Sequence, residues 1–185
     1  MATEKQRARK KWHDIIGKGI FDKVKLGESL VNGAKDLLGK RLKINLMVLT
    51  NDPKKQSITL VFNVVSVEGD NGIADLIGYQ LSTSHVRRVV RKAVKRIDDS
   101  FMLKAKDQTL FAVKPLLIAR HRTNKSTAIA IRKKTRELLQ QSFQKMSGED
   151  VFSAAIGNRL QMDLKNELKK IYPIAVSEIR ILQRR

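Results

Sequence analysis

Residues 82–97 combine an apolar stripe with a row of cations, both at helical spacing. The stripe recurs at i, i+3, i+4, i+7, i+8 and i+11, which places its members on one helix face: Val86, Val89, Val90, Ala93, Val94 and Ile97. The cations between them are Arg87, Arg88, Arg91, Lys92, Lys95 and Arg96. No carboxylate occurs from residue 76 to residue 97. The pattern predicts a helix that docks on a folded domain and presents its other face to a polyanion, such as a phosphate backbone.

A solvated basic face is the alternative interpretation of these residues. Like charges four residues apart on a helix cost about 0.2–0.5 kcal/mol per pair, which favours an outside source of negative charge. A second stretch without carboxylates, residues 108–136, holds Lys114, Arg120, Arg122, Lys125, Arg132, Lys133, Lys134 and Arg136. These cations are spread over a strand end, a linking segment and a helix. Such a spread fits a folded RNA surface better than a straight DNA groove.

The composition of the whole chain agrees with a polyanion partner. Its 185 residues include 38 Lys and Arg against 18 Asp and Glu, a net charge of +20 that a nucleic acid would offset. Hydrophobic residues make up 42%, which excludes a disordered basic tail. Cysteine is absent, so disulfides and cysteine-based zinc sites are excluded and a cytoplasmic location is expected. No signal-peptide segment or apolar window of membrane-spanning length occurs, and no membrane partner is expected.

Candidate catalytic groups are few and lie where structural roles explain them. The chain has no Gly-rich phosphate loop and no nucleophile elbow. A two-metal nuclease uses carboxylate pairs such as Asp98-Asp99 and Glu149-Asp150, but each pair lies at the end of an expected element, where capping accounts for it. His13, His85 and His121 lack metal-ligand spacing. We therefore expect no enzyme, no cofactor and no metal. The alternatives are an RNA-modifying or RNA-cleaving enzyme and a free RNA chaperone.

The elements that must position the cations follow two periods, because alternation predicts strands and a period of 3.6 predicts helices. The expected strands cover residues 41–48, 58–67, 73–81, 101–106, 109–120 and 176–182, and the expected helices cover residues 82–97, 126–143 and 147–171. This order predicts an α+β fold with a largely antiparallel, barrel-like sheet. One basic helix follows the third strand, and two C-terminal helices precede a short final strand.

Composition divides the expected fold into three parts. Residues 1–25 are a basic N-terminal arm, in which Trp12 is interpreted as an anchor to the body rather than a base-stacking residue. Residues 26–125 form a β-rich body that carries the basic helix 82–97. Residues 126–185 add two helices and the final strand packed on that body. We expect no homo-oligomer, and we expect the aromatic side chains within the strands to lie in the core: Phe62, Phe101 and Phe111.

Short motifs predict the ends of several elements. Ser82 is a good N-cap for the basic helix, and Ser147-Gly148-Glu149-Asp150 has the form of a capping box. Gly69-Asp70-Asn71-Gly72 predicts a hairpin turn. Pro115 inside an expected strand predicts an edge or a bulge.

A series of motifs in a fixed order resembles a known family. The motifs are Lys10-Lys11-Trp12, Ile15-Ile16, Ile20-Phe21, Gly27-Glu28, Leu38-Gly39-Lys40, Leu49-Thr50-Asn51-Asp52, Val67-Glu68-Gly69-Asp70, Gly78-Tyr79-Gln80-Leu81-Ser82, Arg96-Ile97-Asp98, Val113-Lys114-Pro115, Ala130-Ile131-Arg132-Lys133, Lys170-Ile171-Tyr172-Pro173 and Glu178-Ile179-Arg180. In number, order and spacing they resemble the archaeal and eukaryotic small-subunit ribosomal protein family known as S-three-A-e, or eS-one. The chain departs from the family at Asp107-Gln108, where Asp-Gly is usual, and its length is that of archaeal members.

The resemblance implies a structural protein of the cytoplasmic ribosome. It would bind small-subunit rRNA on the platform near the mRNA exit, contact neighbouring platform proteins, and support subunit assembly and translation. It could also reach mRNA near the exit. The cations expected to bind rRNA are Lys10, Lys11, Arg87, Arg88, Arg91, Lys92, Lys95, Arg96, Arg120, Arg122, Lys125, Arg132, Lys133 and Arg136.

Overall fold

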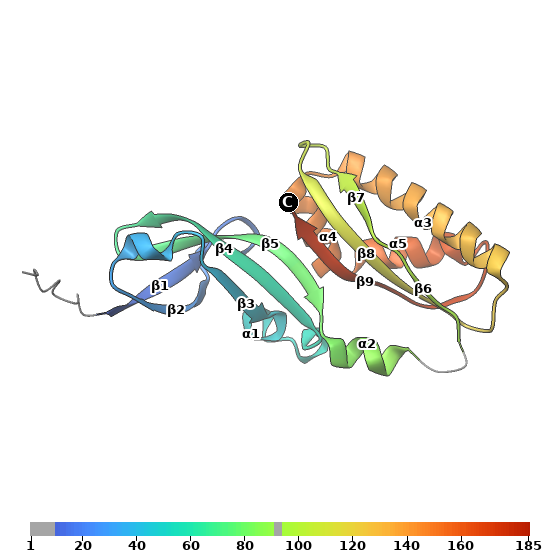
Figure 1. The fold of residues 1–185 in the computed structure, drawn as a ribbon, viewed down its shortest axis with the longest axis horizontal. Helices are drawn as coiled ribbons and strands as arrows, with labels where there is room; N and C mark the ends of the chain where they lie inside the picture. The colour runs from blue at the N-terminus through green and yellow to red at the C-terminus, as the bar shows by residue number, and fades with distance from the viewer. Residues whose placement is uncertain (1–9, 91–93) are drawn as a thin grey trace, which may run out of the picture. The chain divides into compact units, whose positions relative to one another are not determined.

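The computed structural model describes residues 10–90 and 94–185 (Figure 1). Its strands are β1 (Lys11–Gly17), β2 (Lys25–Val31), β3 (Arg41–Asn45), β4 (Ile58–Glu68), β5 (Asn71–Leu81), β6 (Arg96–Asp98), β7 (Phe101–Lys104), β8 (Leu110–Ala119) and β9 (Ile174–Arg184). Its helices are α1 (Leu46–Thr50), α2 (Thr83–Val89), α3 (Lys125–Lys145), α4 (Gly148–Ile156) and α5 (Arg159–Leu168). The described residues pack as two units: unit 1 holds residues 10–44 and 61–76, and unit 2 holds residues 45–60, 77–90 and 94–185.

Unit 1 is built on the pairing of β1 with two neighbours. β1 runs antiparallel to β2 and parallel to β5. Ile15, Leu37 and Phe62 are fully buried in its core, and the ring of Phe21 meets that of Phe62 edge-on at 5.8 Å. Residues 11–17, which the sequence analysis counted in a basic arm, thus form a strand of this unit. Residues 1–9 of the expected arm lie outside the described residues.

Unit 2 is organised by the long pairing of β8 with β9. The register runs from Phe111 opposite Arg184 to Ala119 opposite Ile174. α5 packs on β9, and α3 packs on both α5 and β7, so these helices cover one face of the strands (Figure 1). Where β8, α3 and α4 meet, the ring of Phe111 lies 5.8 Å from that of Phe143 and 5.5 Å from that of Phe152. All three side chains are buried, and large aromatic rings contribute much buried surface, so these rings form the centre of the unit's core.

The α+β fold class is confirmed, but the barrel-like closure is not. Hydrogen bonds join the strands in the order β2-β1-β5-β9-β8-β6, with β4 also beside β3 and β5, and β7 beside β8. This order has two ends, so the nine strands of the described residues form an open sheet. Phe62, Phe101 and Phe111 are buried, as expected of core residues.

Several element predictions need correction. The sequence analysis missed β1, β2, β6 and α1. Because β1 and β2 precede the predicted strands, the basic helix follows the fifth strand of the chain rather than the third. The expected helix 147–171 is two helices, because Asn158 adopts a left-handed φ of 65° directly after Gly157. The final strand, β9, is not short: it has 11 residues and borders both β5 and β8.

The basic helix predicted for residues 82–97 is also shorter than expected. α2 ends at Val89, and Arg96–Asp98 form β6, which pairs with Leu116–Ile118 of β8 and buries Ile97. Two physical effects favour this outcome. The segment's many valines are β-branched and lose side-chain freedom in a helix, while the strand pairing supplies non-local hydrogen bonds that no helix pattern reports. α2 buries no residue completely, so the predicted docked stripe is only partly formed.

The predictions of local motifs are confirmed. The Ser82 hydroxyl accepts a hydrogen bond from the His85 amide at 3.3 Å as the N-cap of α2. Ser147 and Asp150 form the capping box of α4. The register of β8 shifts at Pro115, which is the expected bulge. A turn joins β4 and β5 as expected, but residues 69–70 form it, with Gly69 at the positive φ of 61°, whereas Asn71 and Gly72 of the predicted turn already belong to β5.

Gln108 is strained, because its φ of 60° lies in the left-handed region. Glycine reaches this conformation without a Cβ penalty, so we expect Gln108→Gly to raise the free energy of unfolding by about 0.5–1 kcal/mol. Urea unfolding followed by circular dichroism measures the change. In the control, Gln140→Gly on the exposed side of α3, we expect a loss of about 1 kcal/mol. Destabilisation by both substitutions would contradict the assignment of strain to Gln108.

Candidate nucleic-acid interface

A groove of about 470 Å³ beside α2 collects cations from four elements of unit 2. Arg87 comes from α2, Arg96 from β6, Lys114 from β8 and Arg180 from β9. We call it the α2 groove. Its apolar wall consists of Leu81, Val86 and Ile181. Low-dielectric walls strengthen the attraction between fixed charges and an anion in such a groove.

Three of the four cations in the α2 groove have no carboxylate partner among the described residues. Arg96 pairs with Asp98 of its own strand, whereas no ion pair reaches Arg87, Lys114 or Arg180 in this part of the chain. The Nε atom of Arg180 is buried and has no hydrogen-bond partner there. A buried N–H without an acceptor is costly, and a phosphate oxygen in the groove would supply one.

A second groove, of about 540 Å³, also borders α2. His85, Arg88 and Val89 of the helix face Ile118 and Arg120 across it. It therefore brings together two cations that lie far apart in the sequence, Arg88 and Arg120.

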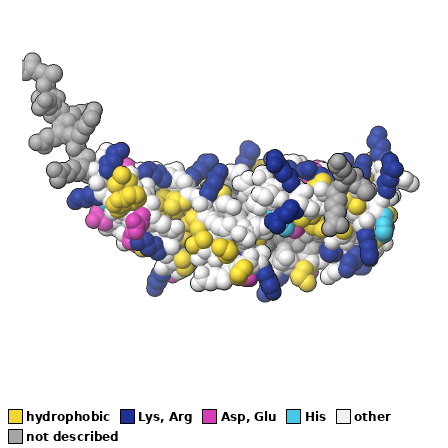
Figure 2. Space-filling view, turned by 90° about the horizontal axis from the view of Figure 1, so that it is seen from below, with side chains coloured by type: hydrophobic (Ala, Val, Ile, Leu, Met, Phe, Trp, Pro, Cys, Tyr) yellow, Lys and Arg dark blue, Asp and Glu magenta, His cyan; other side chains and the backbone are white. Residues whose placement is uncertain are grey.

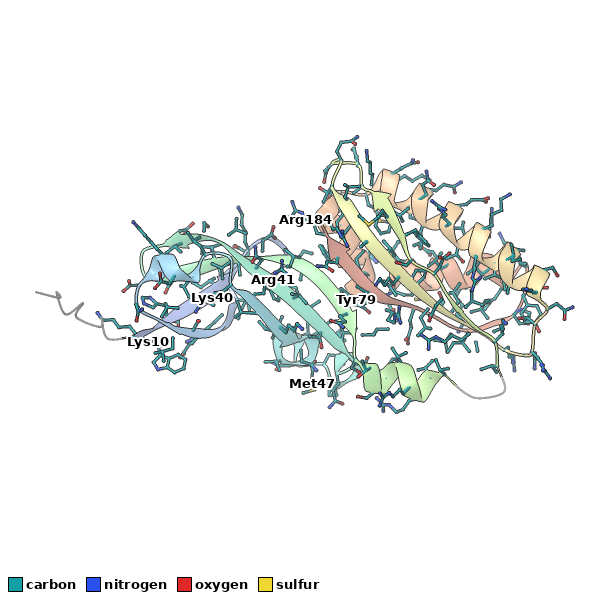
Figure 3. The ribbon with its side chains drawn as sticks, in the orientation of Figure 1. Lys10, Lys40, Arg41, Met47, Tyr79 and Arg184 are labelled. Carbon is teal, nitrogen blue, oxygen red and sulfur yellow. The ribbon has the colours of Figure 1, made fainter. Side chains whose placement is uncertain are left out.

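A hydrogen bond between α2 and β9 positions both grooves. The His85 Nε2 atom lies 2.9 Å from a carboxylate oxygen of Glu178. Glu178 and Arg180 are two residues apart on a strand and share a face. The contact between Glu178 and His85 therefore also places Arg180 on the side of β9 that faces α2. Tyr79, labelled on β5 in Figure 3, is buried, and burial followed by the negative charge of Glu178 raises the pKa of its phenol.

The outer side of α3 is a second cationic surface. Its inward positions are buried, as the helical period requires: Ala128, Ile131, Thr135, Leu139 and Phe143. Four cations around the rest of the helix are exposed: Lys125, Arg132, Lys133 and Arg136. Arg136 also lies over the ring of Phe101, 6.0 Å from its centroid, which limits its freedom to reach a partner. We call this set the α3 face.

Charge is distributed unequally between the two units. The described part of unit 1 has nine Lys and Arg against seven Asp and Glu, whereas that of unit 2 has 24 against 10. On the surface drawn in Figure 2, dark-blue Lys and Arg side chains outnumber the magenta Asp and Glu side chains. The capacity for binding a polyanion is therefore concentrated in unit 2.

The structure groups some of the predicted rRNA-binding residues and separates others. Lys10 and Lys11 are exposed residues of unit 1, whereas both cationic sets are made of unit 2 residues, and Arg91 and Lys92 lie outside the described residues. Lys95 lies before β6, where its carbonyl accepts a hydrogen bond from Ala119 at 3.1 Å. Exposed Arg122 precedes α3, and its carbonyl accepts from the Tyr172 hydroxyl at 3.4 Å.

Sequence reasoning missed two members of the α2 groove as site residues. Lys114 was noticed only as part of a cationic stretch, and Arg180 only as part of a motif. A usable signal was present for Arg180, which lies between the apolar Ile179 and Ile181 of an alternating strand. The sequence does not show which helix lies beside the strand face that carries Arg180. The contact of His85 with Glu178 in the structure identifies that helix as α2.

The carboxylates considered for catalysis have structural partners. Asp98 pairs with Arg96, and the Asp99 carboxylate accepts a hydrogen bond from the Ser100 amide at 2.8 Å. Hydrogen bonds from Ser147 lower the pKa of Asp150 in the capping box. Within residues 10–90 and 94–185, no group of three or more His, Asp or Glu is arranged to hold a metal ion. In the same residues, no helix has the length and apolarity that crossing a bilayer requires.

Comparison with known proteins covers nearly the whole chain. The Ribosomal S3Ae family matches residues 2–183. The small ribosomal subunit protein eS1 of Nanoarchaeum equitans is 32% identical over 176 residues, which is 94% of this chain and 89% of that protein. Proteins of the same name from Saccharolobus islandicus and Saccharolobus solfataricus are each 29% identical over 170 residues, which is 92% of this chain and 82% of theirs.

These matches confirm the family that the ordered motifs indicated. The relatives are archaeal, in agreement with the archaeal-type length of the chain. The family consists of ribosomal proteins and not of enzymes, which agrees with the structural partners of the candidate catalytic carboxylates. The chain, with its cation-lined grooves beside α2, belongs to the Ribosomal S3Ae family.

Proposed function

We propose that this protein is a structural constituent of the small ribosomal subunit in the cytoplasm, where it binds rRNA. The observation that carries the proposal is the α2 groove, in which Arg87, Lys114 and Arg180 converge without carboxylate partners among the described residues. Isolated exposed cations are ordinary on a basic protein. Four cations from four elements around one groove instead form a concave site of the size and charge that a phosphate backbone requires.

The protein binds rRNA mainly through phosphates. Guanidinium groups donate paired hydrogen bonds to phosphate oxygens, and two grooves beside α2, with cations from several elements, suit an irregularly folded RNA better than a straight duplex. Phosphate contacts fix position and orientation without reading sequence. The α3 face extends the contact, and the predicted residues outside both sets, among them Lys10, Lys11 and Arg122, add peripheral contacts.

The position we propose is the platform of the small subunit near the mRNA exit, next to other platform proteins. There the protein supports assembly of the subunit, because neutralising rRNA phosphates lets crowded backbone segments approach one another. The relatives that carry the name of a small ribosomal subunit protein support this placement in the small subunit.

A tethered radical probe tests the position. The chain contains no cysteine, so Ser84→Cys, at an exposed position of α2, accepts a single chelated iron that cleaves nearby RNA. In reconstituted small subunits we expect cleavage of rRNA segments that surround the mRNA exit, mapped by primer extension. The unmodified chain, which cannot be labelled, is the matched control. Cleavage confined to another region would contradict the platform position, and absence of cleavage would contradict the rRNA contact of α2.

Sedimentation separates the proposal from the alternative of a free RNA chaperone. A structural constituent stays with small subunits through a high-salt sucrose gradient, since it is held by many contacts at once. A chaperone bound through transient phosphate contacts is released as salt rises. Release at moderate salt, before any other subunit protein dissociates, would favour the chaperone.

A further inference from the structure

Unit 1 exposes an apolar pair on the hairpin of β1 and β2. Trp12 is 67% exposed and Leu30 is 42% exposed, and the two residues lie opposite each other in the strand register. Their side chains therefore share one face of the hairpin, whereas His13 and Ile15 are buried on the other face. This exposure also corrects the prediction that Trp12 anchors an arm to the body. We call the pair and its surroundings the β1–β2 face.

The same face carries a pair of carboxylates next to the apolar pair. Asp14 and Glu28 are opposite each other in the register, and the Lys25 Nζ atom lies 2.9 Å from Asp14 and 2.7 Å from Glu28. Two carboxylates share one ammonium group, which raises the pKa of Lys25 through its hydrogen bonds to Glu28 and Asp14. Figure 2 shows yellow hydrophobic side chains beside magenta acidic ones at the end of unit 1 where β1 and β2 lie.

This chemistry disfavours a phosphate backbone and fits a basic polypeptide. An anion approaching the side of Trp12 where Asp14 and Glu28 lie would meet the uncompensated charge of that pair, whereas the exposed Lys10 and Lys11 precede Trp12 along the chain, in the unit whose described charge is nearly balanced. A lysine or arginine would instead complete the charge balance. Trp is among the residues that most often dominate protein–protein binding energy, and it does so when a partner excludes water from it.

The edge position of β2 adds a further means of attachment. β2 is the end strand of the sheet order, so within the described residues only β1 pairs with it as a strand. An edge strand presents a row of backbone N–H and C=O groups to which an extended segment can bind.

We propose that the β1–β2 face is the docking site of a basic segment of another protein, which covers Trp12 and Leu30 with an apolar side chain and places a Lys or Arg beside Asp14 and Glu28. This docking site is separate from the rRNA contacts proposed for unit 2. The proposal rests on the proposed function, because a basic partner protein is within reach only if the chain is part of the small subunit. Basic segments are compatible with an rRNA-rich particle, since their remaining charges meet phosphates.

Site-specific photo-crosslinking in assembled small subunits tests this proposal. A benzophenone amino acid replaces Leu30, and the same group at Val65, which is 59% exposed on β4, is the control. We expect position 30 to form an adduct with a peptide of another protein that is rich in Lys or Arg. An adduct with rRNA, with this chain itself or with an acidic peptide would overturn the proposal, as would adduct formation no stronger than at position 65.

Substitutions in the assembled subunit then test whether the apolar and acidic side chains of the β1–β2 face hold the partner. Trp12→Ala together with Glu28→Lys should reduce the yield of a crosslink from position 30 by about tenfold or more, because both the apolar anchor and the charge are lost. Val65→Ala is the matched change on an exposed strand position and should leave the yield unchanged. The rRNA affinity of the purified chain should not fall in the double variant. A lost crosslink with retained rRNA affinity supports the docking site, and an unchanged crosslink yield overturns it. If the unsubstituted chain does not bind small-subunit rRNA, that result counts against the proposed function and not against the docking site.

Discussion

Replacing Arg87, Lys114 and Arg180 together by Gln weakens rRNA binding by about a hundredfold or more, since a hydrogen bond to a charged group contributes roughly 1.5–3 kcal/mol. The three side chains line one groove and have no carboxylate partner among the described residues, so removing their charge leaves no compensating ion pair. The plot of log affinity against log salt should become less steep by about 0.7–0.9 for each lost phosphate contact. Filter binding of the purified chain to small-subunit rRNA across a salt series measures both quantities.

A matched control separates the groove from bulk charge. Lys104, Lys106 and Lys145 are exposed cations of unit 2 outside the α2 groove, and their joint replacement by Gln removes the same net charge. We expect a loss of affinity below about tenfold in this variant, as for general electrostatic steering. Equal losses in the two triple variants would show that net charge, and not the α2 groove, determines binding. Thermal unfolding of both variants checks that each is folded.

The largest effect on stability is expected for Phe111→Ala. The Phe111 side chain is completely buried and touches the rings of Phe143 and Phe152, so its removal leaves a cavity where β8, α3 and α4 meet. Deletions of this kind cost about 3–5 kcal/mol, against a total stability of about 5–15 kcal/mol for ordinary domains. Urea unfolding of the free chain, followed by far-ultraviolet circular dichroism, should show a midpoint shifted to a much lower urea concentration.

An exposed residue of the neighbouring strand provides the control. Met102 on β7 is 45% exposed, and we expect Met102→Ala to cost less than about 1 kcal/mol because much of its surface is already in water. A loss for Phe111→Ala as small as that for Met102→Ala would contradict the position of the aromatic cluster at the centre of unit 2.

The sequence by itself determined the features that depend on local chemistry or on composition. The absence of cysteine and the 42% content of hydrophobic residues are properties of composition, and they excluded the disulfide-linked and disordered classes, while the net charge of +20 indicated a polyanion partner. Ser82 and the Ser147–Asp150 box could be predicted as caps because each satisfies backbone groups within three residues of itself. The bulge at Pro115 follows from a missing amide hydrogen. The ordered motifs indicated the family, since they occur along the chain in a fixed order.

Only the tertiary structure decided the features that depend on contacts between distant residues. The helical pattern of residues 82–97 produced α2 only as far as Val89, because Arg96–Asp98 pair with β8 instead of continuing a helix. Arg180 became part of the α2 groove because the strand register of β9 and the hydrogen bond of Glu178 with His85 turn it toward α2. Trp12 is exposed because the opposite face of its strand, with His13 and Ile15, is the buried one. Periodicity predicts that a residue shares a face with its neighbours, but which face is covered depends on the energy of packing against elements far away in the chain.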